Sequence, residues 1–312
     1  MSRLIMSAAL ALAAILPSVQ AQAQNGTLTR SFVSSTGVDT NACTIAAPCA
    51  TFAQAYTKVG ANGIVAALDP GKYGPISIST PVTINGNGWA AITGPSGADA
   101  IDITVNVSGN VTLIGLELDG AGAADNGINF QAGSRLEIID CTVRDFTQIG
   151  IFVGAHAATS VQISNTKVTD VAVGGQGIQL GTFTGGTITA ALDHVTIDND
   201  NYGFVTIIGG GPIEALITDS HIDNNTTYGI QLYGGSSASN VSTVILNNVT
   251  LNDAGIDLEA YTYIYLSHVT QTSATGFVIP AITLSASPST AYSDGTNHFM
   301  GDVQGTTSWP SN

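Results

Sequence analysis

Positive charge is scarce in this chain. Of its 312 residues only 7 are Lys or Arg, against 22 Asp or Glu, and the formal net charge is −15. A surface this acidic argues against binding to phosphate backbones of nucleic acids or to anionic membranes, and a polyanionic ligand would need a bridging cation. Charged residues make up 9% of the chain and hydrophobic ones 44%, which excludes an intrinsically disordered protein.

Cysteine is also rare, with three in the chain. Cys43 and Cys49 bracket a short loop, and in an exported protein such a close pair predicts a disulfide bond. Cys141 falls at a strand position with no histidine close in sequence. We expect it to pack as a small hydrophobic side chain rather than to react.

Long hydrophobic runs are missing too. The run from Leu4 to Leu16 is shorter than the about 20 residues of a membrane span. It follows Arg3 and precedes the small residues of Ala21-Gln22-Ala23, which is typical of a secretory signal peptide. We therefore expect residues 1–23 to be a signal peptide, with an uncleaved anchor as the alternative. The mature protein would be secreted or periplasmic, without a membrane span.

What is abundant is a repeat. A Gly followed by an apolar residue recurs at intervals of 21 to 27 residues, and a fixed period in this range is typical of a solenoid. These dipeptides are Gly127-Ile128, Gly150-Ile151, Gly177-Ile178, Gly203-Phe204, Gly229-Ile230, Gly255-Ile256 and Gly276-Phe277. Each repeat holds three short segments with alternating apolar residues, too short for helices and separated by turn residues.

Three strands per repeat of this length predict an all-β fold, a single-stranded right-handed parallel β-helix. The framework of a leucine-rich repeat and the nonapeptide of a calcium-binding β-roll are both absent. A polar residue follows the first strand of each repeat, and Asn and Asp at such bends tolerate the left-handed conformation. We expect a structural role for this row, which consists of Asp140, Asn165, His194, Asp219, Asn248 and His268.

The ends of the chain differ from the repeats. Phe52, Ala55, Tyr56 and Val59 have helical spacing, and a solenoid end needs a cap over its open core and strand edges. We therefore expect residues 24–63 to form an N-terminal cap with a short α-helix and the Cys43–Cys49 bridge. The β-helix would span 64–285, and 286–312 would be a C-terminal cap or tail that includes Trp309.

Three features carry a resemblance to a known family: the leading helix, the strand and turn from Leu68 to Tyr73, and the coils in which a strand, an Asn or Asp, a second strand and a Gly-Ile pair follow one another. In these features the chain resembles the pectin lyase-like superfamily over residues 30 to 285. This superfamily contains polysaccharide lyases, glycoside hydrolases, esterases, phage tailspikes and adhesins, so the resemblance implies a fold and not one activity. In its enzymes the chemistry usually lies on the outer face of the strand after the Gly. Those positions here are chemically quiet: Asn129, Phe152, Gln179, Val205, Gln231 and Asp257.

Family catalytic patterns are absent as well. The polygalacturonase set of Asn-Thr-Asp, Asp-Asp, His-Gly and Arg-Ile-Lys is missing, and no clear match to the methylesterase set exists. A lyase of this superfamily needs a basic proton acceptor and usually calcium. The basic residues after the predicted signal peptide are only Arg30, Lys58, Lys72, Arg135, Arg144 and Lys167.

The best catalytic candidates are carboxylates in the turn before the Gly. Asp145 and Asp170 occupy equivalent positions on adjacent coils, where their spacing would approach the about 5 Å of a retaining glycosidase pair. Because any solenoid with Asp in its turns produces such pairs, solvated turn caps are the favoured interpretation. His221 lies near Asp219 and Asp223 in sequence and could act as a base with an orienting carboxylate, although an exposed polar stripe is favoured.

Binding candidates accompany them. Asp198 and Asp223 form a second carboxylate row that could hold Ca²⁺ through oxygen ligands, with a purely structural role favoured. Tyr202 and Tyr228 precede the Gly on adjacent coils and, if exposed, would offer sugar rings a flat platform. Gln231 and Phe152 lie in the outward row beside them.

Two functions therefore stay open. The favoured one is an exported β-helix without a recognisable catalytic constellation that binds glycan or serves a structural role. The alternative is a polysaccharide lyase or glycoside hydrolase. The partner would be a polysaccharide and not a nucleic acid, and neither the glycan nor the oligomeric state can be deduced from the sequence.

Overall fold

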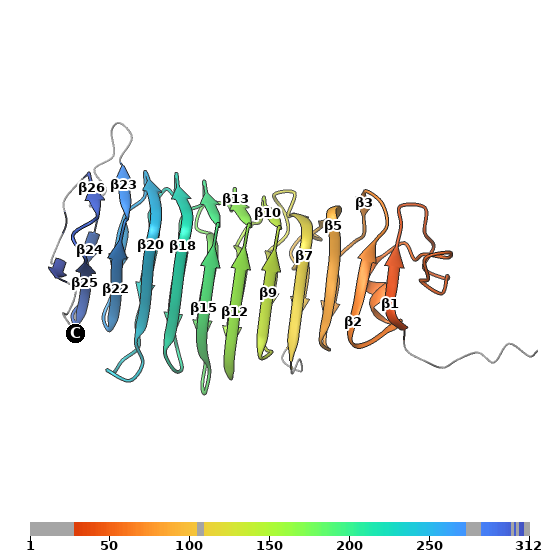
Figure 1. The fold of residues 1–312 in the computed structure, drawn as a ribbon, viewed down its shortest axis with the longest axis horizontal. Coiled ribbons are helices and arrows are strands. Elements are labelled where there is room, and N and C mark those ends of the chain that lie inside the picture. Colours follow the sequence, from red (N-terminus) through yellow and green to blue (C-terminus); the bar gives the residue numbers. More distant parts are fainter. Residues whose placement is uncertain (1–27, 105–108, 273–281, 301–302, 304–305, 309–312) are drawn as a thin grey trace, which may run out of the picture.

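The computed structural model describes residues 28–104, 109–272, 282–300, 303 and 306–308. In this part of the chain the strands stack side by side along one axis into an elongated solenoid (Figure 1). The prediction of an all-β parallel solenoid is confirmed. The predicted signal peptide, the repeat at Gly276-Phe277 and Trp309 lie outside the described residues.

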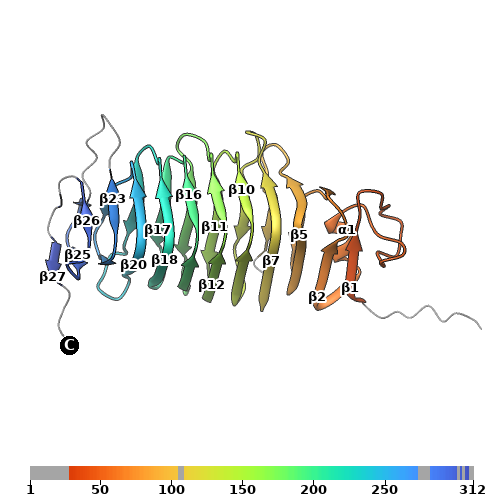
Figure 2. The same cartoon turned by 45° about the horizontal axis from the view of Figure 1, so that its top comes forward.

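One wall of the solenoid is a sheet of nine strands, each hydrogen-bonded in parallel to its equivalent on the next coil (Figure 2). They are β4 (Ile76–Ile78), β6 (Ile101–Ile103), β8 (Asn126–Phe130), β11 (Ile149–Ala155), β14 (Gln176–Thr182), β17 (Tyr202–Ile208), β19 (Tyr228–Tyr233), β21 (Ile256–Leu258) and β24 (Ile282–Leu284). Six of them, β8, β11, β14, β17, β19 and β21, are strands predicted from the Gly-apolar dipeptides.

The other two predicted strands of each repeat belong to a second, 18-stranded sheet. Its first set is β1 (Leu28–Val33), β2 (Val59–Ala67), β5 (Val82–Thr93), β7 (Asn110–Asp119), β9 (Arg135–Ile139), β12 (Ala158–Ser164), β15 (Thr187–Asp193), β18 (Ile213–Asp223), β20 (Ser242–Asn252), β22 (Thr262–Ser267), β25 (Ser289–Ser293) and β27 (Thr306–Ser308). Its second set is β3 (Gly71–Lys72), β10 (Thr142–Arg144), β13 (Lys167–Thr169), β16 (Thr196–Asp198), β23 (Thr270–Thr272) and β26 (His298–Phe299). In β18 and β20 one strand runs through the bend, because ladder bonds continue on both sides of it.

The bend between the two sets is made by the predicted polar row. Its members have left-handed backbones, with φ between 47° at Asn165 and 56° at Asn248. Asn, Asp and His are the residue types that adopt this conformation most readily after Gly, which explains their recurrence. A second left-handed row closes the turn before the nine-stranded sheet and consists of Asp145, Asp170, Asn199, Asn224 and Asp253.

Apolar side chains fill the interior in rows that follow the axis. Equivalent residues on successive coils stack because parallel pairing keeps the same register from coil to coil. One row, contributed by the nine-stranded sheet, is fully buried and runs Ile101, Ile128, Ile151, Ile178, Phe204, Ile230, Ile256 and Ile282. The core is therefore continuous along the described coils.

The start of the described chain contains the predicted bridge and a short helix. The Cys43–Cys49 disulfide is present, and Asp39 accepts hydrogen bonds from the amides of Ala50 and Thr51 just before the helix. Helix α1 (Phe52–Tyr56) is shorter than the spacing predicted, because Val59 already belongs to β2. Its role as a cap stays a prediction.

Parallel pairing extends beyond the predicted range of 64–285 on both sides. Strand β1 pairs with β2, and β25 pairs with β22 and β27. Segments expected to cap the solenoid thus contribute strands to its large sheet.

Candidate functional site

A hollow of about 370 Å³ opens on the outer side of the nine-stranded sheet, over β14, β17 and β19. We call it the tyrosine hollow. It is lined by Gln176, Tyr202, Ile207, Ile208, Gln231, Tyr233 and Gly234. Two of the four predicted binding residues, Tyr202 and Gln231, line it.

Alternation along β19 places Gln231 and Tyr233 outward, and Tyr202 joins them from the start of β17. Tyr202 pairs in register with Tyr228, so the predicted tyrosine pair does lie on adjacent coils. Both tyrosines are half-buried, which leaves part of each ring accessible. Val205 lies on the same outward side yet is 1% exposed, because the surrounding side chains cover it. An aromatic and amide surface over an apolar base suits a sugar ring.

Gln231 is held in place by its neighbour on the next coil. Its Nε2 donates a hydrogen bond of 3.1 Å to Oδ2 of Asp257, its partner on the next coil, and the hydroxyl of Ser285 donates to Oδ1 of the same carboxylate. Gln231 and Asp257 are only 7% and 2% exposed. Since a carboxylate accepts only, this bond orients the amide and leaves Oε1 of Gln231 as its remaining acceptor.

Carboxylates dominate the electrostatics of the hollow. Burial raises the pKa of Tyr228 and of Tyr233, and the negative charges of Asp257 and Glu259 raise both further. The tyrosines therefore stay neutral across the physiological range and can act as hydrogen-bond donors.

Phe152 lies on the same wall but does not line the hollow. It is on β11, where Gln179 separates it from Val205 along the outward row. Its ring is close to Gly154 and Gly181, which leave room for it, and Phe183 stacks on His156 with ring centroids 4.8 Å apart. The aromatic groups of the wall thus form two separate clusters.

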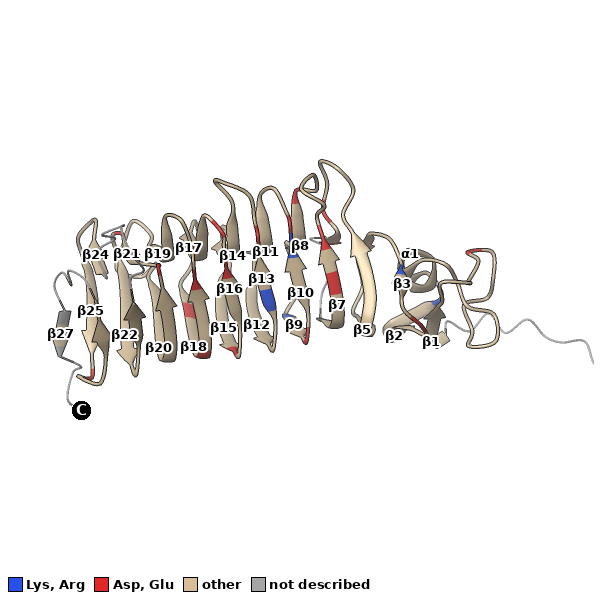
Figure 3. Ribbon diagram, turned by 90° about the horizontal axis from the view of Figure 1, so that it is seen from above, with Lys and Arg blue, Asp and Glu red and all other residues tan. Residues whose placement is uncertain are grey.

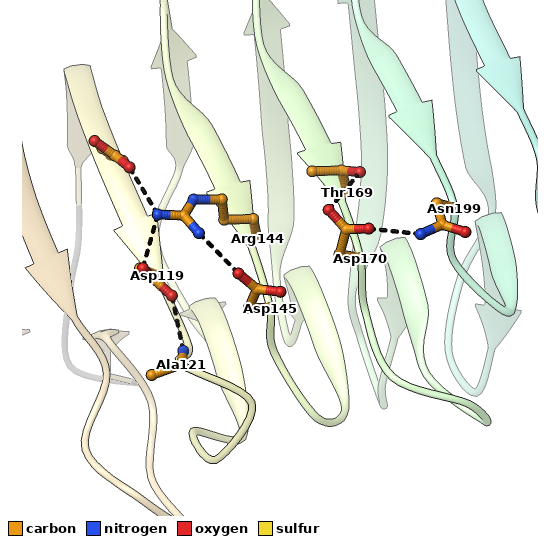
Figure 4. A network of polar contacts seen from close by, with 8 residues as sticks. Asp119, Ala121, Arg144, Asp145, Thr169, Asp170 and Asn199 are labelled. Atoms are coloured by element: carbon orange, nitrogen blue, oxygen red, sulfur yellow. Dashed lines mark hydrogen bonds and ion pairs between the residues drawn. The ribbon is translucent and has the colours of Figure 1, made fainter.

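The predicted catalytic carboxylates bond in different directions (Figure 4). Asp145 accepts from Nη1 of Arg144 at 2.8 Å, and the same guanidinium also contacts Glu117 and Asp119. Asp170 accepts from the amide of Asn199 on the next coil at 2.5 Å and from Thr169 at 3.1 Å. With left-handed backbones and these local partners, both have the features of turn caps. Their catalytic role remains untested.

His221 is exposed on β18, between Thr196 and Thr250 on the neighbouring coils. Asp223 accepts from the backbone and side-chain amides of Asn252, and Asp219 accepts from Asn248. Among the described residues, neither carboxylate is hydrogen-bonded to the His221 ring. The structure therefore shows no hydrogen-bonded His–Asp pair at this place, and the role of His221 as a base stays a prediction.

Asp198 and Asp223, the predicted calcium ligands, do lie side by side in the ladder. Burial raises the pKa of Asp223, and Asp198 adds to this effect. Yet Asp198 already contacts Nζ of Lys167 at 3.6 Å and the Asn224 amide at 2.9 Å. Both carboxylates thus have local partners, as in a polar turn of the solenoid, and calcium binding here stays a prediction.

The structure also contains two clusters of polar side chains that the sequence did not predict. Near one bend, ligand atoms of Asp193, His194 and Asp219 lie within 4.8 Å of one another, all on exposed residues. Near the start of the nine-stranded sheet, Asp99 accepts from the amides of Asn126 and Asn129 at 2.8 and 2.6 Å. Burial raises the pKa of the adjacent Asp102, as does the charge of Asp99.

No protein-family model and no curated protein matches the chain. Among solved structures, the pectate lyase Pel9A resembles it with a TM-score of 0.52 at 13% identity, over 85% of this chain and 74% of the lyase. The chain has the pectin lyase-like β-helix fold. The A-module of mannuronan C-5 epimerase AlgE6 from Azotobacter vinelandii aligns over 76% of this chain and 90% of its own at 14% identity, with a TM-score of 0.28. Identities this low show the fold alone and assign no residue of this chain a role.

Sequence reasoning missed Tyr233, Ile207 and Gln176. Tyr233 lies two residues beyond Gln231 on β19, and Ile207 is its partner on β17. The same alternation that located Gln231 would have found both, had the strands been extended by two residues.

Within the described residues, no helix is long and apolar enough to cross a membrane.

Proposed function

We propose that this chain is an exported right-handed β-helix, closed at its N-terminal end by α1, that binds polysaccharide through the tyrosine hollow without turning it over. The observation that carries the proposal is the convergence of Tyr202, Tyr233 and Gln231 around one hollow. Tyrosine supplies a rigid apolar face with a polar edge, and an oriented amide supplies direction. The Cys43–Cys49 disulfide supports an oxidising compartment outside the cytoplasm.

The test is binding of soluble polysaccharides, followed by affinity electrophoresis and calorimetry. Tyr202→Ala and Tyr233→Ala should each weaken binding of the responding glycan by about tenfold, because each removes one sugar-stacking face. Tyr292→Ala is the matched control, since Tyr292 stacks on Tyr265 on the large sheet, with ring centroids 4.7 Å apart. Equal weakening by all three variants would refute the hollow as the binding site.

The same samples decide between binding and catalysis. The likeness to a pectate lyase makes pectate one polymer of the panel, and both reducing ends and unsaturated-product absorbance should be followed. We expect neither signal to rise. Product formation that disappears in Asp170→Asn would instead establish the enzyme, with Asp170 in its site.

A further inference from the structure

Charge is divided unevenly along the solenoid axis. Every Lys and Arg of the chain lies at or before Lys167, whereas acidic residues continue to the last coils. Figure 3 shows this division: the last blue segment along the chain is on β13, and every coloured segment after it is red. All residues that line the tyrosine hollow follow Lys167 in sequence, and Lys167 itself lies on the other sheet, where it pairs with Thr196.

The immediate surroundings of the hollow have the same sign. Asp257 lies beside Gln231 on the next coil, and the charge of Glu259 adds to the rise that burial causes in the pKa of Tyr228 and Tyr233. Proteins usually bind the carboxylate of a uronate sugar through Arg or Lys, whose N–H groups donate hydrogen bonds to it. Among the described residues, none of the lining side chains of the hollow is Arg, Lys or His.

One polar group of the lining, Gln231, suits a hydroxyl group better than a carboxylate. Gln231 is oriented with its Nε2 on Asp257, so it offers Oε1 as an acceptor. A sugar hydroxyl can donate to this oxygen, and the bond is strengthened through the Asp257 charge behind it. A uronate carboxylate has no proton to donate and would bring a negative charge towards Asp257 and Glu259.

From this arrangement we propose that the hollow selects an uncharged glycan, a neutral hexose or pentose polymer, and rejects polyuronates. This inference rests on the proposed glycan-binding function and adds its substrate class. The rejection comes from the carboxylates around the hollow, so it weakens in high salt, where the screening length falls to a few ångströms.

The experiment compares uncharged galactan, glucan and xylan oligosaccharides with polygalacturonate oligosaccharides of matched length, by calorimetry on the whole mature protein. With EDTA and about 20 mM NaCl, polygalacturonate should bind at least about tenfold more weakly than the best uncharged glycan. Raising NaCl to about 300 mM should narrow that ratio without weakening the uncharged ligand.

A matched pair of charge variants tests the cause. Glu259→Lys should improve polygalacturonate binding by about fivefold or more, since it replaces repulsion by attraction next to the hollow. Glu214→Lys makes the same charge change at an exposed position on β18 of the large sheet and should leave the ratio unchanged. Circular dichroism and thermal melts establish that both variants fold.

The outcomes separate this inference from the function on which it rests. Polygalacturonate binding that equals the uncharged ligands in EDTA and is lost in Tyr202→Ala would overturn the inference and keep the glycan-binding hollow. The inference is overturned in the same way if polygalacturonate becomes the preferred ligand when Ca²⁺ is added. No binding by any glycan would overturn the proposed function and the inference together.

Discussion

The two halves of the solenoid satisfy their carboxylates in different ways. On the N-terminal coils Arg144 gathers three carboxylates, and Arg135 pairs with Glu137. Amides serve on these coils too, as at Asp99. After Lys167 only amides and other neutral donors take this role, as in the bonds from Asn252 to Asp223 and from Asn248 to Asp219. Either a cation or an amide can therefore be the hydrogen-bond partner of a carboxylate at the turns of this fold, but only a cation neutralises the negative charge. The amide-bonded half stays negative, and the tyrosine hollow lies there.

The largest effects on stability should be equal in the two halves, because both halves have the same kind of apolar core. Phe130→Ala and Phe204→Ala remove fully buried rings from different halves, and each should cost about 3–5 kcal/mol of unfolding free energy. Urea unfolding measures both, with Trp89→Ala as an exposed aromatic control that should change stability by less than about 0.5 kcal/mol. A loss confined to one half would show that the halves are packed differently.

A buried acid in the amide-bonded half should give a smaller, pH-dependent effect. Asp200 is 1% exposed, its Oδ1 accepts from the Val171 amide at 2.8 Å, and its Oδ2 has no hydrogen-bond partner among the described residues. Burial raises the pKa of Asp200 to about 7, against 3.8 for the free group. The folded state therefore binds this proton more tightly, so the contribution of Asp200 to stability is most favourable below pH 3.8 and falls as pH rises towards about 7.

Asp200→Asn removes this titration and should stabilise the protein at pH 8 by about 1–3 kcal/mol. The matched variant is Asn225→Asp, at the equivalent position of the next coil and equally buried, which should add a second fall of stability with pH. Chemical denaturation at a series of pH values measures both. An unchanged slope in Asp200→Asn would contradict the assignment.

The smallest effects should distinguish cations from amides directly. Arg144→Gln leaves Glu117, Asp119 and Asp145 without their shared cation and should cost about 1 kcal/mol at low salt and less at high salt. Asn248→Gly keeps the left-handed backbone but removes the amide bonded to Asp219, and should cost about 0.5 kcal/mol at either ionic strength. Thermal melts in two salt concentrations suffice. Equal salt dependence for both variants would refute the distinction.

More of the fold than of the candidate site could be predicted from the sequence. Its period located the strand after each Gly, and the residue types at Asn165 and Asp219 predicted the bends that the backbone angles confirm. The spacing of Cys43 and Cys49 predicted the disulfide. Helix length was overestimated, because Val59 fits a helical pattern as well as the start of β2.

For the site, the period placed Asp145 and Asp170 on neighbouring coils but said nothing of where their carboxylates point. Asp145 bonds to Arg144 within its own coil and Asp170 to Asn199 on the next, a choice that depends on which donor is nearest. The outward row likewise gave Gln231 but not its bond to Asp257.

The sequence by itself determined the solenoid, since local rules of strand alternation and left-handed bends act within one repeat and are repeated in each. Only the tertiary structure decided the hollow. Tyr202, Gln231 and Tyr233 come from two coils, and whether they leave a space between them depends on side-chain directions and on the size of the neighbours across coils. Contacts between residues one period apart are invisible to a local pattern, and they are where the binding surface of a solenoid is made.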